Sequence, residues 1–188
     1  MASTAQRPRL AVDDYLQGEL CSDIRHEYVD GGIYARADAS AAHNIIALNL
    51  AALLRAHLRG GPCQVFIADM KVRLRYRGER FYYPDVQVCC DPQDRETYYR
   101  TRPKLIVEVL SPHTEREDRS SKFYAYRRIN SLEEYVLVAQ EVRRVEVYRR
   151  ATGWDLELYG GDDAIRLESV AFTVAVAEVY ESVDIPPP

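Results

Sequence analysis

The sequence predicts one α/β (α+β) domain, residues 1–188, in which a central mixed sheet is flanked by helices. Three observations favour this class. An apolar stripe recurs at helical spacing over residues 42–58, strand patterns fill much of the remaining chain, and residues 104–110 form a nearly continuous apolar run. Such a run is typical of a central strand covered on both faces.

The first half of the chain contains the clearest signals. A short helix is expected at 12–20, followed by strands at 26–29 and 33–35 that are joined by a turn at Asp30-Gly31-Gly32. The helix over 42–58 has a broad apolar stripe and is ended by Gly60-Gly61-Pro62. Strands are predicted next at 63–74 and 81–89, with Gly78 in the turn between them.

The central strand at 104–110 is ended by Ser111-Pro112, and a second substantial helix is predicted at 115–129. We expect the last residues, 184–188, to form a disordered tail. The elements between are predicted to be strands at 134–138, 142–148, 154–159 and 165–167, and a short helix at 174–180.

Composition and charge limit the classes of function. The chain is 47% hydrophobic and 29% charged, contains no apolar run long enough to span a membrane, and lacks the apolar core of a signal peptide, so a cytoplasmic location is expected. The net charge of −4 speaks against bulk affinity for nucleic acid. Arginines nevertheless cluster locally, which suits either a solvated face or a nucleic-acid ligand; the clusters are Arg73, Arg75, Arg77 and Arg80, then Arg116 and Arg119, then Arg143, Arg144, Arg149 and Arg150.

The four cysteines show no zinc-binding spacing. Cys89 and Cys90 are adjacent and would point to opposite faces of a strand. We therefore expect four free and mostly buried thiols.

Glu108 is the least expected residue in its context. It lies within the apolar run, where an unpaired carboxylate would cost several kcal/mol unless it is paired, protonated or bound to a metal. A structural ion pair or a solvent-facing edge position is the alternative interpretation.

Asp85 follows Pro84 in the preceding strand pattern, where alternation places it on one face with Tyr83 and Gln87. A Pro-Asp pair alone marks little more than a turn or the start of a strand. Asp85 and Glu108 together indicate a metal site, because two carboxylates on adjacent strands can converge on one hard cation such as Mg²⁺.

Two basic side chains are further candidates. Lys122 lies at or beside the buried stripe of the second helix, from which it could reach the sheet as a point charge near a phosphate or a water. The alternative is an ordinary surface pair with Asp118, four residues earlier. His43, at the start of the long helix, could contact a phosphate, although capping or packing is the simpler interpretation.

These residues occur in an order that resembles the metal-site signature of the restriction-endonuclease-like, PD-(D/E)xK, nuclease superfamily. Within it, the chain resembles the Uma-two family of endonucleases over most of its length. The resemblance depends on the order and spacing of several segments: residues 25–31, His43, Pro84-Asp85-Val86, residues 107–112, Lys122 with Tyr126, and Glu133-Glu134-Tyr135.

The resemblance implies a restriction-endonuclease-like fold and a metal-dependent endonuclease that hydrolyses phosphodiester bonds. Asp85 and Glu108 would be ligands of Mg²⁺ or Mn²⁺, with the Val109 carbonyl as a third ligand. Glu27 would be an additional acidic residue, and Lys122 would orient or activate the attacking water. Nucleic acid, in the first place DNA, would be the partner, and cutting two strands would suit a homodimer.

The chain departs from the superfamily pattern at one important position. The lysine usually lies two residues after the glutamate, where this chain has Leu110. Lys122 is the substitute that the family resemblance implies. Val136 and Ala139 also differ from residues common in the family, which we interpret as a difference in packing.

Two other functions remain open from the sequence. The first is a non-catalytic binding or assembly module that retains the fold; in that case Asp85 and Glu108 should lie far apart or be engaged by arginines. The second is an enzyme acting on RNA or a small phosphorylated ligand, for which a narrow pocket is expected.

Overall fold

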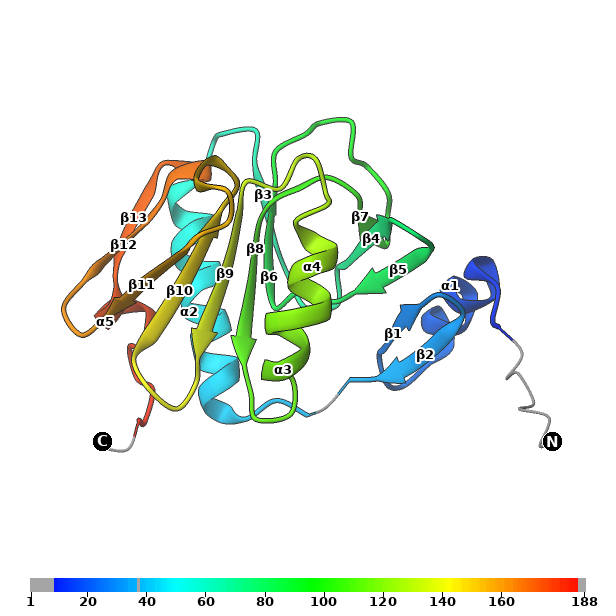
Figure 1. The fold of residues 1–188 in the computed structure, drawn as a ribbon, viewed down its shortest axis with the longest axis horizontal. Coiled ribbons are helices and arrows are strands. Elements are labelled where there is room, and N and C mark those ends of the chain that lie inside the picture. Colours follow the sequence, from blue (N-terminus) through cyan, green and yellow to red (C-terminus); the bar gives the residue numbers. More distant parts are fainter. Residues whose placement is uncertain (1–8, 37, 186–188) are drawn as a thin grey trace.

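The computed structural model describes residues 9–36 and 38–185, and its centre is a six-stranded sheet that lies between helices (Figure 1). The strand order is β11-β10-β9-β8-β6-β3; β8 and β9 are parallel and the other neighbours are antiparallel. The predicted α+β class with a mixed sheet is confirmed. The six strands are β3 (Gln64–Ile67), β6 (Val86–Cys89), β8 (Pro103–Leu110), β9 (Glu134–Ala139), β10 (Arg144–Arg149) and β11 (Leu156–Gly160).

Helix α2 (Ala41–His57) covers one face of this sheet. It begins where the Ser40 hydroxyl accepts a hydrogen bond from the backbone N–H of His43, and it ends before Gly60, whose positive φ of 82° suits glycine. Its apolar stripe, which includes Leu54, packs against alternate side chains of β8 such as Val107. The predicted long helix is confirmed.

A second helical segment covers the opposite face in front of β8 (Figure 1). It consists of α3 (Glu115–Glu117), a π-helical turn η1 (Asp118–Lys122) and α4 (Phe123–Tyr126). The predicted helix at 115–129 therefore ends earlier, because the chain closes into a turn with Ile129 N–H bonded to the Tyr126 carbonyl. Ile106 and Leu110 of β8 point to this side, so strand alternation places Glu108 under the same helical segment.

A five-stranded sheet, in the order β2-β1-β5-β4-β7, adjoins the central one. Helix α1 (Val12–Cys21) packs on it through Tyr15, which contacts Tyr28 and Phe81. The predicted turn between β1 and β2 is confirmed, with positive φ angles at Asp30 and Gly31. The strands are β1 (His26–Val29), β2 (Gly32–Ala35), β4 (Lys71–Arg75), β5 (Glu79–Tyr82) and β7 (Tyr99–Arg100).

Two predicted strands were wrong in the same way. Residues 63–74 form β3 and β4, which belong to different sheets and are separated by a turn at Asp69 with a φ of 101°. Residues 81–89 divide into β5 and β6 at Tyr83-Pro84-Asp85, because proline has no N–H for a sheet ladder. Each break carries the chain between sheets, and the second one releases Asp85 from regular strand structure.

The C-terminal part completes the core on the side of α2. The hairpin of β12 (Ala164–Leu167) and β13 (Phe172–Ala175) is followed by α5 (Val176–Val179), so the predicted helix at 174–180 is confirmed only in its middle. Short 3-10 turns, η2 (Arg150–Thr152) and η3 (Glu168–Val170), connect these elements. Of the predicted tail, residues 186–188 lie outside the described residues.

The expectation of four free cysteines was wrong for one pair. Cys63 and Cys90 form a disulfide. Gln64 pairs with Cys89 across β3 and β6, so the next residues outward, Cys63 and Cys90, face each other with their Cα atoms 4.0 Å apart. Cys89 is buried and Cys21 exposed, and both are free.

Within the described ranges, no helix is both long enough and apolar enough to cross a bilayer.

The contact between α2 and the sheet generates a test of the core. Leu54 is fully buried, whereas Leu48 on the same helix is 60% exposed. We expect Leu54→Ala to lower the free energy of unfolding by about 2–5 kcal/mol, because it leaves a cavity against the sheet. The matched change Leu48→Ala should stay within about 0.5 kcal/mol. Urea unfolding of both variants measures the difference, and equal losses would contradict this packing.

Candidate active site

The structure brings the side chains of all four predicted catalytic residues to one acidic cavity of 180 Å³. The cavity lies near the C-terminal end of β8, the end that the arrowhead of this strand marks in Figure 1. Glu27 comes from β1, Asp85 from the break before β6, Glu108 from β8 and Lys122 from the last position of η1. β6 and β8 are neighbours, so the two carboxylates do lie on adjacent segments of the sheet.

Lys122 is a buried ammonium surrounded by carboxylates. Its Nζ lies 3.0 Å from Glu27 Oε1, 3.1 Å from Asp118 Oδ1 and 3.6 Å from Glu108 Oε1. Burial alone would lower the pKa of Lys122, but these carboxylates outweigh it and raise the pKa well above its ordinary value. Lys122 is therefore charged at neutral pH and can only donate hydrogen bonds.

Glu108 is 2% exposed, and its Oε1 accepts a hydrogen bond of 3.0 Å from the Tyr126 hydroxyl. Its pKa is raised well above the ordinary value, chiefly by burial, although Lys122 opposes the shift; nearby carboxylates add to it. The solvent-facing alternative for Glu108 was therefore wrong.

Asp85 has a different set of partners. Its Oδ1 lies 3.1 Å from Arg36 Nη2, and its Oδ2 lies 3.1 Å from His43 Nε2 and accepts a 2.8 Å hydrogen bond from the Val109 N–H. Burial disfavours the charged carboxylate, but His43, the Val109 amide and Arg36 together lower the pKa of Asp85. Asp85 is thus a carboxylate whose two oxygens both have partners.

His43 contributes to the site through its side chain. The sequence suggested capping or packing as the simpler role for His43. In the structure Ser40 caps the helix, and Nε2 of the His43 ring contacts the Oδ2 atom of Asp85. The Val109 carbonyl stays a prediction as the third metal ligand. The contact that Val109 makes in the site is the hydrogen bond from its backbone N–H to Asp85.

Two residues of the site were missed by sequence reasoning. Arg36 follows β2 directly and is one of many arginines in the chain, so no pattern singled it out. Asp118 was interpreted as the partner of Lys122 on the surface; the pair exists, but Asp118 is 1% exposed and its pKa is raised, chiefly by burial. Its four-residue spacing from a buried lysine was the available signal.

The donor set agrees in chemistry with a hard divalent cation. Six carboxylates line the cavity, against two permanently charged cations, Arg36 and Lys122. The buried Oδ1 atom of Asp118 lies 3.1 Å from the Lys122 ammonium, without a well-aligned hydrogen bond among the described residues. In the same residues, however, no three His, Cys, Asp or Glu side chains are already grouped as a metal cluster. A cation that binds Asp85 would compete with Arg36 and His43 for its oxygens.

The fold is that of the restriction-endonuclease-like nucleases. It superposes on the crystal structure of "a putative nuclease belonging to DUF820" from Anabaena variabilis with a TM-score of 0.71 and 16% identity, covering 89% of this chain and 96% of the other. Residues 12–177 match the profile of the Uma2 family, described as "putative restriction endonuclease", and the chain belongs to this family.

Two uncharacterized proteins of Synechocystis sp. are similar in sequence. Protein slr1290 is 37% identical over 180 residues, which is 94% of each chain. Protein sll1609 is 35% identical over 144 residues, 75% of this chain and 81% of the other. The resemblance seen in the sequence motifs therefore extends over nearly the whole chain.

The position of Lys122 gives a stability prediction that does not depend on activity. We expect Lys122→Met to lower the free energy of unfolding by about 3–5 kcal/mol in EDTA, because it leaves buried carboxylates without their cation. Lys104 forms only a partly exposed pair with Glu133, at 3.4 Å, so Lys104→Met should cost at most about 1 kcal/mol. Denaturant unfolding compares the two, and a small loss for Lys122→Met would show that the carboxylates do not need it.

Proposed function

We propose that this protein is a divalent-metal-dependent endonuclease that hydrolyses phosphodiester bonds in nucleic acid, DNA in the first place. The observation that carries the proposal is the acidic cavity, in which Asp85, Glu108 and the ammonium of Lys122 converge. Membership of a family described as restriction endonucleases supports the same reaction.

Asp85 and Glu108 would hold the cation, with the Val109 carbonyl and Glu27 as further oxygen donors. A bound Mg²⁺ or Mn²⁺ supplies Lewis-acid polarisation of the phosphate and eases the ionisation of water. Additional positive charge in the cavity also lowers the cost of keeping Glu108 ionised, which the structure otherwise makes unfavourable.

Lys122 would orient the attacking water and stabilise the negative charge that develops on the phosphate oxygens. Its three carboxylate partners fix the ammonium in place, so little reorganisation is needed when the substrate reacts. Because its pKa is raised, Lys122 would act as a hydrogen-bond donor and an electrostatic group, and the proton of the water would have to leave by another route.

Arg36 would have two roles. It lines the acidic cavity and also an adjoining cavity of 550 Å³, so it lies where a substrate phosphate would approach Asp85. The guanidinium of Arg36, which donates one hydrogen bond to Asp85, has further N–H donors with which it would bind a substrate phosphate.

We expect Asp85→Ala to reduce the cleavage of supercoiled plasmid DNA with Mn²⁺ or Mg²⁺ at least about a hundredfold, because loss of a ligand removes several kcal/mol of transition-state stabilisation. Asp162 is exposed and lines neither the acidic cavity nor an arginine-lined one, so Asp162→Ala is the matched control. We also propose that the protein is a homodimer whose two active sites cut the two strands. Linear plasmid should then form without prior accumulation of nicked circles. Undiminished cleavage by Asp85→Ala would contradict the metal site.

The ion pair between Arg36 and Asp85 favours a second candidate, a non-catalytic module that retains the fold. In that case Arg36 would be a permanent structural partner of Asp85, as the sequence interpretation required of such a module. The two candidates differ in what happens to metal affinity when Arg36 is removed.

For the endonuclease, we expect Arg36→Met to tighten Mn²⁺ binding about tenfold or more, because the cation no longer competes with a charged hydrogen bond to Asp85. Arg166, an exposed arginine paired with Glu168, provides the control Arg166→Met. Isothermal titration calorimetry measures both. Failure of the wild type and of Arg36→Met to bind Mn²⁺ would favour the non-catalytic module.

A further inference from the structure

A second pair of cavities has the opposite charge to the active site. The two adjoin each other through Tyr76, have volumes of 350 Å³ and 640 Å³, and include no carboxylate in their linings. We call their shared surface the arginine–tyrosine face. Its aromatic members include Tyr76 and Tyr124. Its polar members are mainly arginines, namely Arg73, Arg75, Arg77, Arg80, Arg102, Arg119, Arg127 and Arg128.

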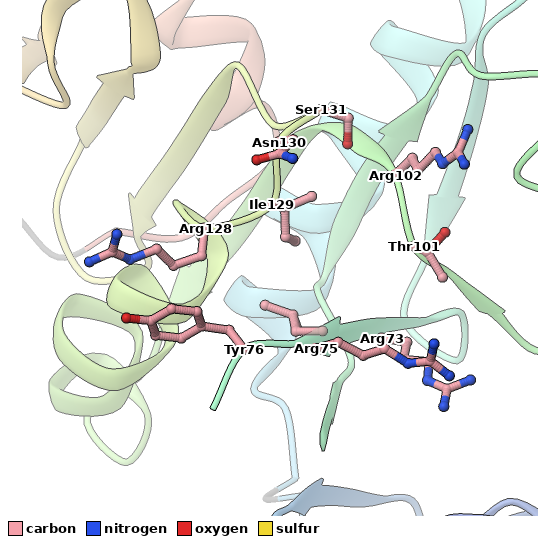
Figure 2. Close-up of a pocket in the computed structure, with 10 residues that line it drawn as sticks. Arg73, Arg75, Tyr76, Thr101, Arg102, Arg128, Ile129, Asn130 and Ser131 are labelled. Carbon is pink, nitrogen blue, oxygen red and sulfur yellow. The ribbon is translucent and has the colours of Figure 1, made fainter. Parts of the chain in front are cut away.

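Segments distant in the sequence build this face. In Figure 2, Arg73 and Arg75 extend from β4, Arg102 lies next to the start of β8, and Arg128 lies beside Tyr76. The sequence showed Arg73 to Arg80 only as a local cluster. The fold adds Arg119 from the outer side of the helical segment 115–126, and Arg127 and Arg128 from the turn after it, so that arginines distant in the sequence form one surface.

Most of these arginines have a carboxylate partner nearby. Arg73 and Arg75 pair with Glu79, and Arg80 pairs with Asp30. Arg119 pairs with Glu115 and Glu146, and Arg102 with Asp91. These pairs fix the shape of the face and neutralise much of its charge.

Arg77, Arg127 and Arg128 are different. Among the described residues, none of the three has a carboxylate within ion-pair distance. Each lies instead over a tyrosine ring: Arg77 at 5.5 Å from the centre of Tyr76, Arg127 at 4.6 Å and Arg128 at 5.0 Å from the centre of Tyr124. Three stacked guanidiniums therefore keep their charge and free donors on a chain whose net charge is −4.

The chemistry of the face fits one kind of partner best. Guanidiniums bind phosphate oxygens with two parallel hydrogen bonds, and their planes and tyrosine rings stack with unpaired bases. Tyr124 is 44% exposed, so part of its ring remains open to a ligand. An acidic peptide would satisfy the charge but would leave the stacking surfaces unused.

We propose that the arginine–tyrosine face binds a single-stranded segment of nucleic acid, with Arg77, Arg127 and Arg128 on the phosphates and the Tyr76 and Tyr124 region under the bases. The inference rests on the proposed function, and it narrows the substrate of that site to nucleic acid that has an unpaired segment next to the point of cleavage.

The position of the face agrees with this role. Arg119, Ser120 and Ser121 line it, whereas Asp118 and Lys122 of the same η1 turn line the acidic cavity. A helix with its side chains is about 10–12 Å across. A strand held on the face therefore lies within a few nucleotides of the proposed site of cleavage.

The test measures binding without cleavage. A fluorescein-labelled single-stranded oligodeoxynucleotide is titrated with protein in EDTA, and fluorescence anisotropy gives the affinity at several salt concentrations. We expect the triple variant Arg77→Gln, Arg127→Gln, Arg128→Gln to bind at least about tenfold more weakly, and the slope of log affinity against log salt to fall by about 2, because about 0.7 counterions are released per phosphate contact on a single strand.

The matched control removes the same charge elsewhere. Arg55, Arg59 and Arg143 are exposed, and in the described structure they too have no carboxylate within ion-pair distance; they lie outside the face. Changing these three to Gln should leave affinity and slope nearly unchanged. Equal losses in both triple variants would overturn the proposal, because they would show that only net charge matters.

Tyr124 separates stacking from charge. Tyr124→Phe retains the ring but removes the hydroxyl that accepts a 3.0 Å hydrogen bond from Arg128, so it should lose less affinity than Tyr124→Leu, which should lose about fivefold or more. Displacement of the oligonucleotide by polyglutamate at equal charge would overturn the proposal. Since binding is measured in EDTA, a protein that binds but does not cleave would contradict only the proposed function.

Discussion

The ammonium of Lys122, held by Glu27, Glu108 and Asp118, joins three parts of the fold that have little else in common. Glu27 belongs to the five-stranded sheet, Glu108 to the central sheet, and Asp118 to the helical segment that covers it. Taking a single charge out of water costs several kcal/mol, so the cluster forms only when all three parts are in place. The acidic cavity therefore exists only in the assembled fold, and the positions of its side chains depend on all three parts.

Much of the fold follows from local patterns. The apolar spacing of α2 and the glycines after it predicted that helix almost to the residue. The apolar run of β8 correctly indicated a strand covered on both faces. The breaks at Asp69 and at Pro84 were missed, because each looks like the interior of a strand when only neighbouring residues are considered. What divides these strands is that their halves pair with different sheets, and pairing between distant segments leaves no trace in the local pattern.

The candidate site was predictable in part, for a similar reason. Glu108 stood out because a carboxylate in an apolar strand requires a partner, and Asp85 and Lys122 followed from motif order. Arg36 had no such signal, since an arginine after an exposed edge strand is unremarkable in a sequence. The buried state of Asp118 was also invisible, because a spacing of four residues from a lysine suits a surface pair equally well. Residues that are unusual for their local context could be found, whereas residues made unusual by distant contacts could not.

The two sides of the η1 turn show how one short segment separates opposite charges. Its residues Asp118 and Lys122 face the acidic cavity, and Arg119 faces outward among the arginines. An acidic site repels a polyanion unless cations are supplied, so a nucleic-acid strand needs a basic surface close by to be held at all. Arg36 contributes at the boundary of the cavity, where its guanidinium already pairs with Asp85. With the proposed function, attraction of the strand by one surface and compensation of charge at the other would be separate tasks. A chain with a net charge of −4 would then suit a nucleic-acid substrate.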